Sequence, residues 1–107
     1  MTAKAEVCPG ACGFTSVIKA TRLDKKHVRV NIKTGCEKLG KMNGDLYKID
    51  WSRDIFSNIR DSAVYNSADK HSIHTDCPVP SVIIKAIQIE LESMLPVDVS
   101  VKFEKIS

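Results

Sequence analysis

The residues of this chain best suited to chemistry are its four cysteines, because a thiolate is both a metal ligand and a nucleophile. They are Cys8, Cys12, Cys36 and Cys77 in a sequence of 107 residues. Each lies in a loop or at the boundary of a predicted element, whereas a structural cysteine more often packs inside a strand or helix as a small apolar residue. We therefore interpret the four cysteines as one thiolate site.

The length, composition and net charge of the chain limit which class of protein carries this site. A length of 107 residues, with 43% hydrophobic and 27% charged residues, is typical of an ordinary folded domain, and we take residues 1–107 as a single domain. Sixteen basic and thirteen acidic residues give a net charge of +3, which is too small a bias to predict nucleic-acid binding. The composition names no partner, and it leaves the oligomeric state open.

Neither a secretion signal nor a membrane span is expected. Residues 1–7 contain no continuous apolar stretch, and no long uncharged apolar run follows them. We therefore expect a cytoplasmic protein. In that reducing compartment, clustered cysteines hold a metal or do redox chemistry more often than they form structural disulfides.

The elements that must position the cysteines follow from hydrophobic periodicity. Period-2 alternation and β-branched residues predict strands near residues 3–7, 15–23, 28–33 and 97–104. A largely buried helix is expected from Pro80 to Met94, and a shorter one begins near Asp54. Alternation with one polar face indicates an antiparallel sheet, and the helices should cover its apolar face. The predicted fold class is therefore α+β, with two layers and about four strands.

This fold would bring the cysteines together. The first strand leads into the loop with Cys8 and Cys12, the second strand runs back, and the third returns to end at Cys36. Cys77 joins them if the helix from Pro80 starts at the same end of the sheet. Cys36 and Cys77 each precede a predicted helix, whose free N–H groups and dipole favour a thiolate.

The first hypothesis is a metal site with Cys8, Cys12, Cys36 and Cys77 as ligands. Four thiolates suit tetrahedral zinc or an iron–sulfur cluster. Proline directly after two of the cysteines slightly favours the cluster, although the spacing does not decide between the metals. His71 and His74 could replace a cysteine as ligand, but exposed positions in a loop are the more ordinary interpretation of both.

The second hypothesis is thiol or sulfur-transfer chemistry at Cys77. The segment Cys77-Pro78-Val79-Pro80 resembles the Cys-Pro-x-Pro helix start of small sulfur-carrier proteins, whose cysteine bears a persulfide. The resemblance implies that Cys77 is the catalytic, sulfur-bearing residue. A cysteine of low pKa at a helix N-terminus is also a good sulfur acceptor on physical grounds. Whether the protein is an enzyme is left open.

The third hypothesis is a protein- or RNA-interaction module. Gly10-Ala11-Cys12-Gly13 matches a bare G-x-x-G, and a basic patch is formed by Lys25, Lys26, His27 and Arg29. The RNA-clamping G-x-x-G joins two helices, whereas this one joins two predicted strands, so nucleic acid is not expected.

Glu90 interrupts the apolar face of the last helix. It could be a buried acid, the partner of a lysine or arginine, or part of a subunit contact.

The cysteine pattern as a whole resembles that of a small uncharacterised family of anaerobic archaea and bacteria. The pattern consists of Cys8-Pro9-Gly10-x-Cys12-Gly13-Phe14, then Cys36, then His74-x-x-Cys77-Pro78-Val79-Pro80. The resemblance spans nearly the full chain. It implies no particular activity, and it favours oxygen-sensitive chemistry. No catalytic triad, Walker loop or dinucleotide fingerprint indicates another enzyme class.

Overall fold

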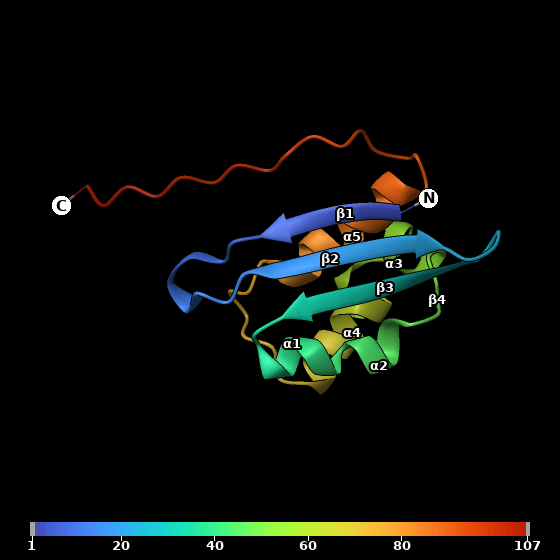
Figure 1. Ribbon diagram of the computed structural model, residues 1–107, viewed down its shortest axis with the longest axis horizontal. Helices are drawn as coiled ribbons and strands as arrows, with labels where there is room; N and C mark the ends of the chain where they lie inside the picture. The colour runs from blue at the N-terminus through green and yellow to red at the C-terminus, as the bar shows by residue number, and fades with distance from the viewer. Residues whose placement is uncertain (1, 107) are drawn as a thin grey trace.

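The computed structural model describes residues 2–106, which form a sheet covered by helices (Figure 1). The antiparallel strands lie in chain order and are β1 (Thr2–Val7), β2 (Ser16–Arg22), β3 (His27–Thr34) and β4 (Ile49–Asp50). The helices are α1 (Glu37–Lys41), α2 (Asn43–Leu46), α3 (Ser52–Ile55), α4 (Ala63–Lys70) and α5 (Val79–Glu90), with short 3-10 turns η1 (Gly10–Cys12) and η2 (Ile59–Asp61). The predicted α+β class is confirmed.

The sheet has one buried and one exposed face because its strands alternate. In β3, Val28, Val30 and Ile32 are buried, while Arg29 and Asn31 between them are exposed. Successive side chains of a strand point to opposite faces, so this pattern places all three apolar side chains under the helices. The helical layer therefore covers one face, as expected.

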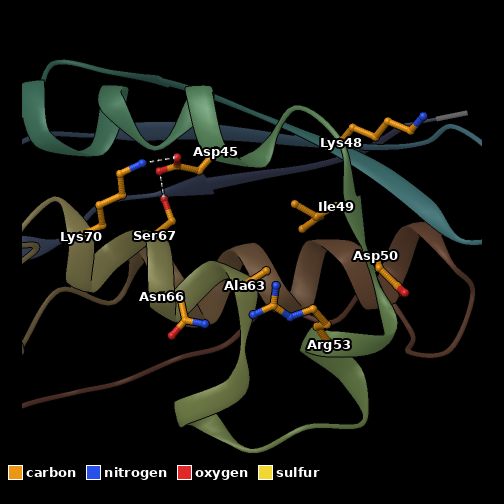
Figure 2. Close-up of a pocket in the computed structure, with 9 residues that line it drawn as sticks. All are labelled: Asp45, Lys48, Ile49, Asp50, Arg53, Ala63, Asn66, Ser67 and Lys70. Atoms are coloured by element: carbon orange, nitrogen blue, oxygen red, sulfur yellow. Dashed lines mark hydrogen bonds and ion pairs between the residues drawn. The ribbon is translucent and has the colours of Figure 1, made fainter.

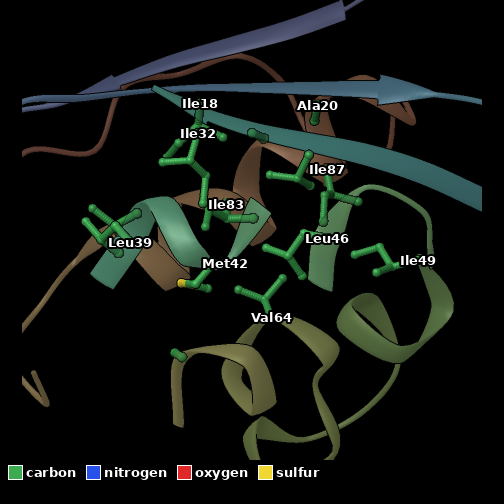
Figure 3. Close-up of a cluster of buried hydrophobic side chains, with 14 of the residues drawn as sticks. Ile18, Ala20, Ile32, Leu39, Met42, Leu46, Ile49, Val64, Ile83 and Ile87 are labelled. Atoms are coloured by element: carbon green, nitrogen blue, oxygen red, sulfur yellow. The ribbon is translucent and has the colours of Figure 1, made fainter. Parts of the chain in front are cut away.

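Helix α5 is the main cover of the sheet. It packs against β1 and β2, and Ile83 and Ile87 are fully buried. Figure 3 shows these two side chains facing Ile18 and Ile32 of the sheet. The helix ends at Glu90 rather than at Met94, because the chain turns there and reaches a left-handed backbone conformation two residues later. No helix within residues 2–106 is long and apolar enough to cross a membrane.

Helices α1, α2 and α4 fill the other side of the core. Met42, Leu46 and Val64 are fully buried and converge in Figure 3. Strand β4 pairs only with the first two residues of β3. Further along β3, the side-chain amide of Asn43 pairs with the strand edge in place of a neighbouring strand. Its Oδ1 accepts from the N–H of Ile32 at 2.7 Å, and its Nδ2 donates to the carbonyl of Ile32 at 2.9 Å.

Two expected elements are wrong. The segment 97–104 is not a strand of this sheet: it extends away from the body in Figure 1, with Val99 and Val101 62% and 68% exposed. Alternation specifies an amphipathic strand without specifying the edge to which it pairs, and the short β4 supplies the fourth strand instead. The helix expected to begin near Asp54 is also wrong, because α3 ends at Ile55 and the chain forms η2 before α4.

Glu90 has a specific partner. Its Oε2 accepts a hydrogen bond from the backbone N–H of Arg22 at 2.9 Å, at the end of β2. The carboxylate therefore joins the last turn of α5 to the sheet. Within residues 2–106 Glu90 is neither fully buried nor ion-paired with a basic side chain, so the first two interpretations are wrong. A subunit contact stays a prediction.

Candidate functional site

The four cysteines lie at one end of the sheet. Val7, Ser16 and Thr34 form one row across β1, β2 and β3, and each is the terminal residue of its strand at that end. Cys8 and Cys36 follow the first and third of these strands. Helix α5 also begins at this end (Figure 1), so Cys77 is brought to the same region.

The loop between β1 and β2 carries the two exposed cysteines, Cys8 and Cys12. It turns tightly because Gly10 and Gly13 adopt φ values of +80° and +77°, a conformation that costs a glycine little. The N–H of Gly13 donates to the carbonyl of Gly10 at 3.0 Å. Both thiols are therefore open to solvent and to a reagent or an ion.

Cys36 is held more firmly at the end of β3. Its backbone N–H donates to Thr34 Oγ1 at 3.1 Å, and Ser16 Oγ donates to the same oxygen at 2.8 Å. Cys36 begins α1 and is partly buried against the hydrophobic core. The end of the sheet therefore fixes the backbone of this cysteine.

Cys77 precedes α5 and is also partly buried against the core. Burial raises the pKa of its thiol, and this effect outweighs the backbone N–H of Val79, which stabilises the thiolate. The expectation that the start of α5 would leave Cys77 with a low pKa is therefore wrong. Removal from water disfavours the charged form more than one hydrogen bond favours it.

The neighbours of Cys77 raise its pKa further. The thiols of Cys12 and Cys36 and the carboxylate of Asp76 all disfavour a negative charge on the Cys77 sulfur. All three neighbours therefore act in the same direction as burial. The loop between β1 and β2, the end of β3 and the start of α5 thus lie at the same end of the sheet (Figure 1).

The thiols do not form a ready-made coordination shell. All four cysteines are free, and within residues 2–106 no group of three or more Cys, His, Asp or Glu side chains is arranged to hold a metal ion. His74 is exposed, and its carbonyl accepts from the N–H of Cys77 at 3.0 Å. His71, which we expected to be exposed, is partly buried because α4 ends beside Asp45 and the His71 ring is hydrogen-bonded to that carboxylate.

Asp45 is the centre of a polar cluster that the sequence did not indicate. Its carboxylate accepts from Ser67 Oγ at 2.7 Å and Lys70 Nζ at 3.0 Å, and its Oδ2 is 2.8 Å from His71 Nε2. The hydrogen bonds from Ser67 and Lys70, followed by that from His71, lower the pKa of Asp45 to about 2. In hindsight, Ser67, Lys70 and His71 have the spacing of one helical face.

This cluster lies at one end of an open cleft of about 400 Å³ between α2, β4 and α4 (Figure 2). Ser, His and Asp meet here, but the aspartate lies between the other two. In a hydrolytic triad the histidine lies between serine and aspartate and removes the serine proton. Ser67 instead donates to Asp45, so the cluster joins α2 to α4 and does not create a nucleophile.

Comparisons with known proteins give a family and no activity. No curated protein and no solved structure shows significant similarity to the chain. Residues 3–103 match the model of a family of unknown function, so the match includes all four cysteines and every helix and strand described above except the first residue of β1. The chain belongs to this family, DUF6951.

Proposed function

We propose that the protein binds zinc or an iron–sulfur cluster through Cys8, Cys12, Cys36 and Cys77. The observation that carries the proposal is the meeting of three separate chain segments at one end of the sheet, each contributing at least one free thiol. Cys8 and Cys12 are exposed, and the Cys8 sulfur accepts a hydrogen bond from the Thr15 hydroxyl at 4.0 Å. Four thiols gathered from distant parts of a chain are the usual composition of a zinc or cluster site.

Electrostatics supports a cation at this place. Burial first, and then the Cys12 and Cys36 thiols and the Asp76 carboxylate, raise the pKa of Cys77. A bound metal removes both penalties, because it supplies positive charge and displaces the thiol protons. Cys36 and Cys77 would form the fixed half of the site, and the loop with Cys8 and Cys12 would close over the metal.

Sulfur transfer at Cys77 is the second candidate. The N–H of Val79 stabilises the Cys77 thiolate, which is the feature that a persulfide carrier needs at its helix start. The net pKa is nevertheless raised, so little thiolate is available at neutral pH without a metal. We therefore favour metal binding.

The two candidates differ in what purified protein should contain. The full chain is purified without oxygen, and zinc, iron and acid-labile sulfide are measured per chain. Iron with sulfide selects the cluster, and zinc at one per chain selects a zinc site. Neither metal, with a mass increase of about 32 Da that disappears in Cys77→Ser, selects persulfide chemistry.

Variants identify the ligands. Each single Cys→Ser substitution should lower metal content, since each removes one bond to the metal. Thr75→Ala is the matched control, because Thr75 is an exposed side chain two residues before Cys77. Full metal content in all four Cys→Ser variants would refute the metal proposal. A carrier would depend on Cys77 alone and would tolerate Cys12→Ser.

A further inference from the structure

The segment 97–104 is an amphipathic strand without a sheet. Its apolar side chains, Val97, Val99, Val101 and Phe103, are 73%, 62%, 68% and 94% exposed. They alternate with Asp98, Ser100, Lys102 and Glu104. A contiguous row of exposed valines and phenylalanine is unusual on a surface that stays in contact with water, and such apolar rows mark interaction surfaces.

Strand β1 provides an edge that such a segment could extend. Within residues 2–106, β1 pairs with β2 on one side and has no strand on the other. The unpaired N–H and C=O groups of an edge strand are a template for another chain. Helix α5 packs against β1, and further apolar side chains on it and directly after it are only partly buried: Val82, Ile84 and Leu91.

We propose that the segment 97–104 of one copy of this chain pairs antiparallel with β1 of a second copy through its residues 101–104, and that the exchange is reciprocal. Direction is the reason for assigning the partner. In Figure 1 the segment leaves the end of α5 near the start of β1 and runs in the same direction as β1. Within one chain it could therefore add only as a parallel strand, whereas a copy related by a two-fold axis perpendicular to the strands presents it in the antiparallel direction.

Charge selects one register. With Lys4 opposite Glu104, Glu6 lies opposite Lys102, so that both pairs on the exposed face have opposite signs. A shift of two residues one way places Lys4 opposite Lys102, and a shift the other way places Glu6 opposite Glu104. Like charges directly opposite one another destabilise a strand pair. The register with two favourable pairs is therefore distinct from both neighbouring ones.

The same register is consistent on the apolar face. Ala5 of β1 then lies opposite Phe103, and Val7 lies opposite Val101. The small side chain of Ala5, which is partly buried, leaves room for the aromatic ring. A shift by a single residue would turn the valines to the polar face. In this alignment residues 101–104 lie opposite residues 4–7 of β1, and Val97 and Val99 extend beyond Val7, alongside the loop between β1 and β2.

The oligomeric state tests this proposal independently of metal binding. The full chain is studied by sedimentation over a wide range of concentration, with a chelator and a reductant so that neither metal nor disulfides link copies. A dimer is expected. Val101→Asp should raise its dissociation constant about a hundredfold, because a buried valine is lost twice by symmetry. Ser100→Asp, the matched control on the opposite face, should leave the dimer intact.

Charge reversal tests the register. Lys4→Glu and Glu104→Lys should each weaken the dimer, and the double variant should restore it. A chain that stays monomeric at all concentrations would overturn the proposal, whether the segment is free or paired within its own chain. A dimer that is insensitive to Val101→Asp, or a double variant without rescue, would overturn it equally.

Discussion

The ring of Phe14 lies directly against Gly35. A Cβ atom built on Gly35 would be 3.0 Å from Cδ1 of Phe14, which is closer than ordinary van der Waals contact. Phe14 ends the loop that carries Cys8 and Cys12, and Gly35 precedes Cys36. This contact therefore holds two of the thiol-bearing segments together, and it requires a residue without a side chain at position 35.

Gly35→Ala should not stabilise the protein, although replacing a glycine by alanine usually does. Replacing a glycine of ordinary conformation by alanine stabilises by about 0.4–1 kcal/mol through the unfolded chain. At Gly35 the clash with Phe14 should cancel this gain, whereas Gly44→Ala on α2, where no atom lies within 4 Å of the new Cβ, should keep it. Urea denaturation of the two variants measures the difference. Equal stabilisation by both would contradict the Phe14 contact, and Phe14→Ala should abolish the difference.

The Asp45 cluster should make stability depend on acid pH. The folded pKa of Asp45 is lowered from 3.8 to about 2, so its contribution is present above pH 3.8 and is lost as the pH falls towards 2. Because the side chain remains 27% exposed, we expect about 1–2 kcal/mol. Asp45→Asn should lower the free energy of unfolding at pH 7 and make little difference at pH 2. Asp69→Asn, an exposed position on α4, is the control, and a deficit in Asp45→Asn that is equal at both pH values would contradict this origin.

Asp54 should tolerate an amide and not a methyl group. It is 7% exposed, and its Oδ1 accepts from the hydroxyl of Ser62 and, at 3.1 Å, from the N–H of Val64. Its Oδ2 has no hydrogen-bond partner within residues 2–106. Asp54→Ala would leave two buried donors without an acceptor and should cost about 2–3 kcal/mol. Asp54→Asn keeps the acceptor and should cost less than half as much in thermal or urea unfolding. Equal losses in both variants would show that the charge itself is required.

The sequence predicted the parts of the fold that depend on local periodicity. Alternation located β1, β2 and β3 to within a residue or two, and the apolar circumference of α5 located the main helix. The segment 97–104 carries an equally clear pattern, yet a pattern identifies a strand and not its partner. Helix propensity near Asp54 failed because the carboxylate binds Ser62 and Val64, which fixes a loop where a helix was expected.

The location of the candidate site at one end of the sheet was predictable from the strand topology. In an antiparallel sheet the first and third strands end at the same edge, so Cys8 and Cys36 had to lie at one end of the sheet. The protonation of Cys77 was not predictable, because it depends on how deeply the sulfur packs against the core. The Asp45 cluster was missed for a related reason: Asp45 and His71 are far apart in sequence, and only the packing of α2 on α4 joins them.

The central claim is that the four thiols act as one site, and zinc protection against alkylation tests it most directly. Reduced, metal-free protein is treated with iodoacetamide at neutral pH, and modified thiols are counted by intact mass and located by peptide mapping. Without metal all four should react, with Cys77 the slowest because its raised pKa keeps it protonated. With one equivalent of zinc, or after anaerobic reconstitution with iron and sulfide, all four should be protected together. The account would be contradicted if neither treatment protected all four thiols, for instance if Cys36 and Cys77 were protected while Cys8 and Cys12 still reacted.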